Sequence, residues 1–124
     1  MRVPKDIPLL CPRFRRASEL IGRRWTGAII YVLLEARCRF ATLRAAVPGI
    51  TDRMLSGRLQ ELEAKGIVAR TVVPVTPVRV EYALTRKGRE LAAAVDAIAA
   101  WAERWIPPPA AAAPRPRRSR VRPR

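Results

Sequence analysis

The sequence predicts a mainly α-helical fold with one small β-hairpin, and two observations carry that prediction. Residues 51–65 place apolar side chains at the spacing of one helix face and polar side chains on the opposite face. These faces consist of Leu55, Leu59 and Leu62 on one side and Arg53, Ser56 and Gln60 on the other. Two runs rich in β-branched residues follow, 67–73 and 78–84, with Pro74 to Pro77 between them. A helix with a polar outer face followed by a hairpin is the arrangement of a winged helix-turn-helix, whose shape suits a DNA groove.

Three shorter helices are predicted ahead of residues 51–65, over 13–21, 25–35 and 39–47. The positions expected to face inward are Phe14, Ala17 and Ile21 in the first, Trp25, Ala28, Ile29, Val32 and Leu33 in the second, and Phe40, Leu43 and Val47 in the third. Pro48-Gly49 ends the third helix, and Thr51 then stands where an N-cap belongs. Two helices joined by a short glycine-containing turn make a helix-turn-helix.

The second strand of the hairpin alternates strictly, which predicts a strand buried on one face. Its inward residues would be Val78, Val80, Tyr82 and Leu84. Residues 85–105 are predicted to form one continuous helix, about 30 Å long at 1.5 Å per residue. Its apolar stripe exceeds what so small a fold can cover, so we expect it to pair with a second copy of the chain. The predicted interface consists of Leu91, Val95, Ile98, Trp101 and Trp105.

The chain divides into three segments. Residues 1–12 are expected to form an N-terminal arm, and 13–106 the winged helix-turn-helix domain with its dimerisation helix at 85–105. Residues 107–124 combine proline, alanine and arginine without apolar periodicity, which predicts a disordered tail.

The charge indicates a nucleic-acid partner. There are 25 basic against 10 acidic residues, a formal charge of +15 and a sequence pI near 11.7. Removing the six arginines beyond Pro107 leaves 19 basic against 10 acidic residues, a charge of +9, so the bias does not depend on the tail. The tail itself is expected either to neutralise phosphates or only to improve solubility.

The composition also excludes several classes of function. The chain has no histidine and only two cysteines, which removes histidine-based catalysis and the usual metal-ligand spacings. We therefore expect no enzyme activity, no cofactor and no metal. No apolar run reaches the length of a membrane span, so the expected location is cytoplasmic and nucleoid-associated, without a membrane partner.

A series of short motifs resembles one known family, the HxlR-type winged-helix transcriptional regulators, relatives of the MarR group. In order, the motifs are Cys11-Pro12, residues 20–26 (LIGRRWT), 39–43 (RFATL), 48–56 (PGITDRMLS), 59–63 (LQELE), 77–85 (PVRVEYALT) and Gly88. The resemblance implies a homodimeric DNA-binding repressor or activator whose terminal helices make the dimer. Several members of the family sense electrophiles or oxidants through a cysteine ahead of the first helix, and Cys11 occupies that position. The chain departs from the family at Gly57, where a long polar residue is more usual, and in the loop before Phe40.

The candidate DNA contacts lie mainly on the helix from Thr51. Arg53 is the best candidate for a specific contact, because a guanidinium binds guanine O6 and N7 in a bidentate manner. Ser56 and Gln60 share its face, and Thr51 is a further candidate contact at the entry to the helix. The remaining candidates are the phosphate or groove contacts Arg24, Arg39, Thr42 and Arg79, each with the alternative of an ordinary surface charge or polar side chain. For Arg79 that alternative is an acidic partner across the strands of the hairpin.

Cys11 is the candidate redox sensor, because nearby arginines and a helix N-terminus both lower a thiol pKa. The alternative is a small half-buried residue without a sensing role, and the sequence also leaves open a Cys11–Cys38 bond.

We interpret the chain as a homodimeric, sequence-specific transcriptional regulator that binds an inverted-repeat operator in double-stranded DNA. A small-molecule or electrophile inducer is a further expected partner. The alternatives are a basic nucleoid or RNA-binding protein without sequence preference, and a winged helix used for protein contacts.

Overall fold

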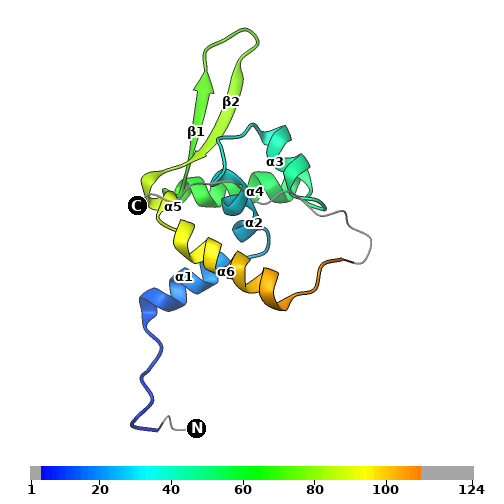
Figure 1. Ribbon diagram of the computed structural model, residues 1–124. Helices are drawn as coiled ribbons and strands as arrows, with labels where there is room; N and C mark the ends of the chain where they lie inside the picture. The colour runs from blue at the N-terminus through cyan, green and yellow to red at the C-terminus, as the bar shows by residue number, and fades with distance from the viewer. Residues whose placement is uncertain (1–3, 110–124) are drawn as a thin grey trace, which may run out of the picture.

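The computed structural model describes residues 4–109 and confirms the predicted fold class, a mainly helical chain with a two-stranded antiparallel hairpin (Figure 1). Within those residues the elements are α1 (Pro12–Gly22), α2 (Thr26–Leu33), α3 (Phe40–Ala46), α4 (Asp52–Ala64), β1 (Val68–Val73), β2 (Arg79–Leu84), α5 (Arg86–Arg89) and α6 (Ala92–Trp105). The first three residues of the expected arm, and 110–124 of the expected tail, lie outside the described residues. In the described part, no helix combines the length and apolarity that crossing a bilayer requires.

The core forms around α2, which contacts α1, α3, α6 and β2. Ile29 and Ile30 of α2 are completely buried, and the three leucines of α4 pack into the same cluster, as predicted. Burying a leucine side chain contributes about 1.5–3 kcal/mol. The core is completed by Leu33, Cys38, Leu43, Val47, Ile50, Ile67, Val68, Leu84 and Val95. Because the leucine face of α4 turns inward, its polar face has to turn outward.

Two glycines set the ends of α4. Gly49, in the turn between α3 and α4, has φ +89°, and Gly66, after the last turn of α4, has φ +72°. Other residues rarely adopt this left-handed conformation. The predicted helix-turn-helix and the predicted helix over residues 51–65 are therefore confirmed.

The hairpin projects away from the helices as the wing of the fold (Figure 1). Its strands pair from Val68 with Leu84 at the base to Val73 with Arg79 near the tip. A third extended segment joins the sheet, because Cys38 and Tyr82 exchange backbone hydrogen bonds of 2.9 and 2.8 Å. This bridge fixes the hairpin to the segment that leads into α3.

The prediction that β2 is buried on one face is wrong. Leu84 alone of the strand is fully buried, the other five residues are half-buried on both faces, and Val78 beside the strand is 68% exposed. The reason is geometric, since the hairpin extends beyond the core and the outer part of the strand has no second layer to pack against.

The inward positions predicted for the first two helices are partly wrong. Phe14 and Ala17 are exposed, and α1 buries no residue fully, because it meets α2 through Leu20 and Ile21 near its end. In α2, Ala28 is exposed, while Ile30, which the stripe omitted, is in the core.

The final helix is also not continuous, contrary to the prediction. The side chain of Thr85 accepts a hydrogen bond from the amide of Gly88 and donates one to the carbonyl of Gly66, so α5 is attached to the end of α4. The chain then turns at Glu90-Leu91, where the Leu91 amide bonds the carbonyl of Gly88, and α6 starts in a new direction across α2. At 1.5 Å per residue, the 14 residues of α6 span only about 21 Å.

Gly88 provides a test of the packing at this junction. An added Cβ would overlap the carbonyl oxygen of Ile67 and crowd the side chain of Leu84 at 3.0 Å. Gly88→Ala should therefore destabilise the protein by about 1–3 kcal/mol, the usual cost of overpacking, although alanine favours a helix. The matched control is Gly22→Ala, where an added Cβ meets no atom within 4 Å. Urea unfolding measures both, and a Gly88→Ala protein as stable as the wild type would contradict the close packing.

Candidate nucleic-acid interface

The outer face of α4, defined here as Arg53, Ser56, Gly57 and Gln60, lies opposite the buried leucines of the helix. The side chains of Arg53, Ser56 and Gln60 are exposed, as predicted. Thr51 caps the helix, because its hydroxyl accepts a hydrogen bond of 3.2 Å from the amide of Met54. The first turn of the helix thus presents polar side chains from a fixed backbone, as a helix that enters a major groove requires.

Gly57 lies in the middle of this face. Its backbone is ordinary helix, and an added Cβ would meet no atom within 4 Å. In a helix interior, glycine is about 1 kcal/mol less favourable than alanine. The fold therefore gives no packing reason for a glycine at this position.

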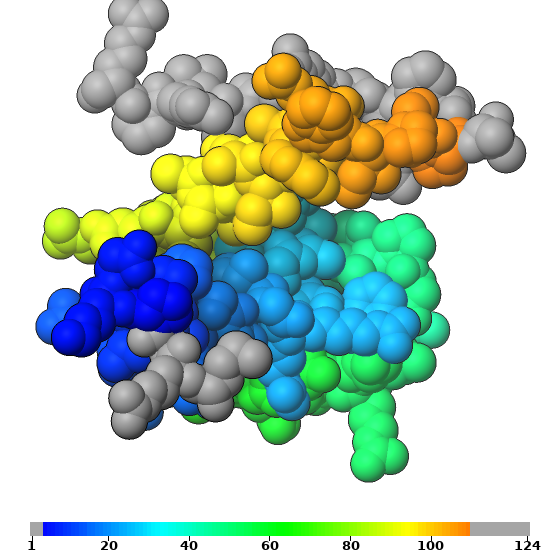
Figure 2. All heavy atoms as spheres, turned by 90° about the horizontal axis from the view of Figure 1, so that it is seen from below, coloured from blue at the N-terminus to red at the C-terminus, as the bar shows by residue number. Residues whose placement is uncertain are grey.

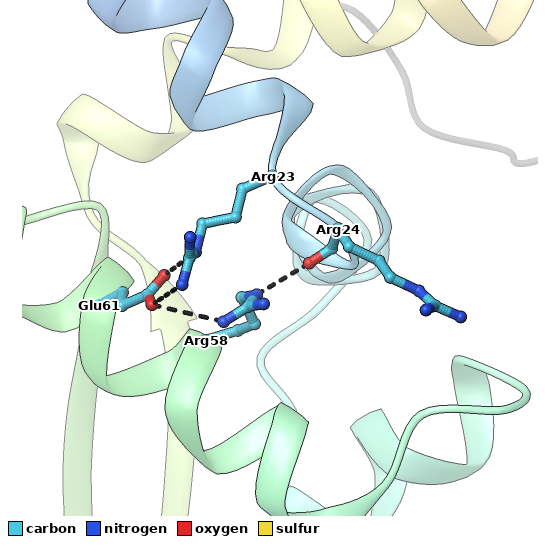
Figure 3. A network of polar contacts seen from close by, with 4 residues as sticks. All are labelled: Arg23, Arg24, Arg58 and Glu61. Atoms are coloured by element: carbon cyan, nitrogen blue, oxygen red, sulfur yellow. Dashed lines mark hydrogen bonds and ion pairs between the residues drawn. The ribbon is translucent and has the colours of Figure 1, made fainter.

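A polar cluster attaches the inner side of α4 to the turn between α1 and α2 (Figure 3). Arg58 donates from Nε to the carbonyl of Arg24 at 2.8 Å and from Nη1 to Glu61 at 3.3 Å. Arg23 binds the same carboxylate in a bidentate manner, at 2.8 and 2.7 Å. Charge-assisted bonds of this kind are stronger than neutral ones and fix an orientation. The cluster thus sets how α4 sits on the fold.

The turn that this cluster holds contains a strained residue. Trp25 has φ +76°, a left-handed conformation that costs a non-glycine residue roughly 1–2 kcal/mol. The bond from Arg58 to the carbonyl of Arg24, next to Trp25, helps to hold the strained turn closed.

Arg24, a predicted DNA contact, does not join the cluster through its side chain. Figure 3 shows its guanidinium pointing away from Glu61, and its carbon Cζ lies 4.8 Å from the centre of the Trp25 ring. Arg23, in contrast, is engaged by Glu61. Of the two adjacent arginines, Arg24 is the one whose charge is directed outward.

Two further candidates, Arg39 and Arg79, line a groove of about 630 Å³ between the start of α3 and the wing. Arg39 is exposed at the N-cap position of α3, and Thr42 is exposed on the same helix. Arg79 lies 3.7 Å from Glu81, which also pairs with Arg37 at 3.5 Å. Arg79 therefore has an acidic neighbour, but on its own strand and not across the hairpin as the alternative interpretation expected.

The wing loop, residues 74–78, carries no charged residue. Val75 and Val78 are exposed there, so the tip of the wing is apolar and its cations come from the strands. Arg70, exposed on β1 opposite Tyr82, is one that the sequence patterns did not predict. Its place in a predicted strand of the wing was the signal for it.

The two cysteines occupy opposite environments and are not bonded to each other. Cys11 is exposed at the N-cap of α1, and the backbone amides of Phe14, and then Arg13, lower the pKa of its thiol. Cys38 is buried, its Sγ donates to the carbonyl of Ala36 at 3.3 Å, and burial raises its pKa. Cys11 is thus the more reactive of the two.

An exposed apolar surface, the terminal surface, lies on the side opposite the wing. Figure 2 shows the N-terminal segment and α1 (blue) and α6 (yellow to orange) along this side. Its exposed members are Leu9, Leu10, Phe14, Ile98, Trp101 and Trp105. Of the other two residues predicted for the dimer interface, Val95 lies in the core at 6% exposure and Leu91 is half-buried against it.

The polar cluster of α4 predicts a measurable stability difference. Glu61→Gln removes the charge that Arg23 and Arg58 share, and Arg58 is only 16% exposed. We expect a loss of about 1–2 kcal/mol, somewhat below the range for bonds to charged groups because Glu61 is partly exposed. Glu19→Gln is the control, since the Arg15–Glu19 pair is well exposed and should change stability by less than about 0.5 kcal/mol. Equal effects in urea unfolding would show that the cluster does not hold α4.

Comparison with known proteins agrees with this geometry. The family described as HxlR-like helix-turn-helix matches residues 20–110. The uncharacterised HTH-type transcriptional regulator YvaP of Bacillus subtilis (strain 168) is 46% identical over 99 residues, which cover 80% of this chain and 92% of YvaP. The reduced form of the transcriptional regulator YodB from B. subtilis has a TM-score of 0.71 at 43% identity, over 79% of this chain and 96% of YodB; YodB has also been solved with quinone bound. The redox regulator HypR in its oxidised form has a TM-score of 0.71 at 40% identity, over 76% of this chain and 96% of HypR. The chain belongs to the HxlR family of winged helix-turn-helix transcriptional regulators.

Proposed function

We propose that the chain is a homodimeric regulator that recognises an inverted-repeat operator through the outer face of α4. The observation that carries this proposal is the orientation of α4, whose leucines are buried while Arg53, Ser56 and Gln60 are exposed from a capped first turn. A major groove admits an α-helix, and an arginine that binds guanine in a bidentate manner contributes about 1–3 kcal/mol of discrimination.

The terminal surface supports the homodimer. Large apolar side chains of the N-terminal segment, α1 and α6 are exposed in the single chain, and exposed apolar surface beyond what a monomer usually shows marks interaction sites. A two-fold dimer presents two copies of α4, and helix-turn-helix dimers bind half-sites about 34–36 Å apart, one turn of DNA. The operator would therefore be an inverted repeat.

A thiol response through Cys11 is the regulatory part of the proposal. The thiol is exposed, its pKa is lowered, and it stands at the start of α1, next to the terminal surface. The redox regulator HypR and the quinone-bound form of YodB, both similar to this chain, make oxidants and quinones the inducers to test. Modification of Cys11 would act on the dimer and, through it, on the spacing of the two recognition helices.

The high positive charge favours a second candidate function, binding of nucleic acid without sequence preference. The two functions predict different changes in DNA binding as the salt concentration rises. A specific regulator keeps a preference for its operator over random DNA, whereas a purely electrostatic binder loses affinity for both alike. Selection of genomic fragments by the full chain at about 200 mM salt, a concentration at which phosphate-driven binding is already weakened, tests the proposal and provides the operator. Recovery without any shared sequence would favour the second candidate.

Arg53→Ala tests whether α4 reads bases. We expect its affinity for the selected operator to fall at least tenfold, and its affinity for random DNA of equal length to change by less than about twofold, because one phosphate-independent contact is lost. Binding is measured by fluorescence anisotropy at fixed salt. Arg15→Ala on the exposed face of α1 is the matched control for loss of one charge. If both DNAs lose affinity equally, Arg53 contacts phosphate only.

Trp105→Asp tests the proposed interface. Trp105 is 62% exposed near the end of α6, so the single chain should tolerate the change while an apolar dimer contact would not. Light scattering should give a dimer for the wild type and a monomer for the variant, with an unchanged helical circular dichroism signal. A variant that keeps the mass of the dimer would place the interface elsewhere.

Cys11→Ser tests the thiol response. Because a buried thiol with a raised pKa reacts slowly, we expect quinone or hypochlorite to change operator binding of the wild type and of Cys38→Ser, but not of Cys11→Ser. The measurement is anisotropy before and after treatment, with reversal by a reducing thiol for the oxidant. A Cys11→Ser protein that responds like the wild type would refute the sensor.

A further inference from the structure

Gly57 has no structural explanation within the protein. Gly88, Gly49 and Gly66 do have one, because a Cβ at Gly88 would overlap the Ile67 carbonyl and because Gly49 and Gly66 have positive φ. Gly22 and Gly27 also have room for a Cβ, but they lie in the last turn of α1 and the first turn of α2, not in a helix interior. Gly57, in contrast, is in the middle of α4 with helical backbone and open space beside it. Because glycine is the least favourable residue for a helix interior apart from proline, its use there points to something outside the chain.

The position of Gly57 on α4 indicates which partner outside the chain explains the glycine. It follows Arg53 by four residues and precedes Gln60 by three, so it lies on the same stripe of the helix, opposite the buried leucines. Its neighbour Ser56 is short. Arg58, the next long side chain, is held on the inner side by the Arg24 carbonyl and by Glu61 (Figure 3).

The outer face of α4 therefore carries its smallest side chains at its centre. Long polar side chains stand at its two ends, at Arg53 and Gln60, which are about 10 Å apart along the axis. Between them only a hydroxymethyl group and bare backbone separate the helix from solvent.

We propose that Gly57 is the point of closest approach between α4 and the major groove, and that it determines specificity by letting the helix backbone lie against one base-pair edge. This inference rests on the function proposed above. Arg53 and Gln60 then reach the base pairs on either side. A methyl group at residue 57 would stand about 1.5 Å out from the backbone. That displacement exceeds the tolerance of hydrogen bonds, which weaken beyond about 3.2 Å.

The proposal makes stability and specific binding change in opposite directions. Gly57→Ala should raise the Tm of the full chain by several degrees, and should lower its affinity for the selected operator about tenfold. Affinity for random DNA of equal length should stay within twofold, because phosphate contacts tolerate a small shift. Gly57→Leu should lose at least a hundredfold in operator affinity while keeping the helical circular dichroism of the wild type. Gly22→Ala, an open helical glycine at the end of α1, is the matched control and should leave operator binding unchanged.

Three outcomes would overturn the inference. Gly57→Ala could bind the operator as tightly as the wild type, which would show that no close approach occurs there. It could lose affinity for both DNAs equally, which would make the effect non-specific. It could lower the Tm, which would give the glycine a structural role. A wild-type chain with no preferred DNA site is a separate result, which would refute the proposed function and this inference with it.

Discussion

The burial of one face of α4 is the constraint on which the rest of the structure depends. Leu55, Leu59 and Leu62 are at most 2% exposed, and they pack into the core that α2 organises. Since the face opposite a buried stripe must face solvent, the position of Arg53, Ser56 and Gln60 follows from the hydrophobic effect alone. The end of α4 in turn anchors the base of the wing and, through Gly66, the start of α5.

Apolar packing leaves some freedom of rotation and sliding, and polar contacts remove it. The bonds of Arg58 and Arg23 around Glu61 tie the middle of α4 to the turn that contains the strained Trp25. The same turn joins α1 to α2. The helix that carries the candidate base contacts is thus directly attached to the element that begins at Cys11 and contributes to the terminal surface. A movement of α1 in a dimer would therefore be transmitted through these contacts to the outer face of α4.

Local patterns were enough to predict the helix-turn-helix and the wing. The leucine spacing of α4 and its Thr51 cap are encoded within a few residues, and both were confirmed. The predictions that failed concern features that depend on contacts between residues far apart in the sequence. The final helix is interrupted at Glu90-Leu91, after Thr85 has attached α5 to the carbonyl of Gly66. The burial of β2 is uneven because the wing extends beyond the core. The role of Arg58 was missed for the same reason, since its acceptor, the carbonyl of Arg24, is 34 residues away in sequence.

The most direct test of the central claim, that two copies of the outer face of α4 enter successive major grooves, is a dimethyl sulfate footprint on the selected operator. This reagent methylates guanine N7 in the major groove. The account predicts two protected guanine patches, symmetrically placed about one helical turn apart, and loss of protection at one guanine in each half-site with Arg53→Ala. Guanines that stay fully reactive under saturating protein, or a single protected patch, would contradict it and show that the chain binds DNA through its charge or through one recognition helix only.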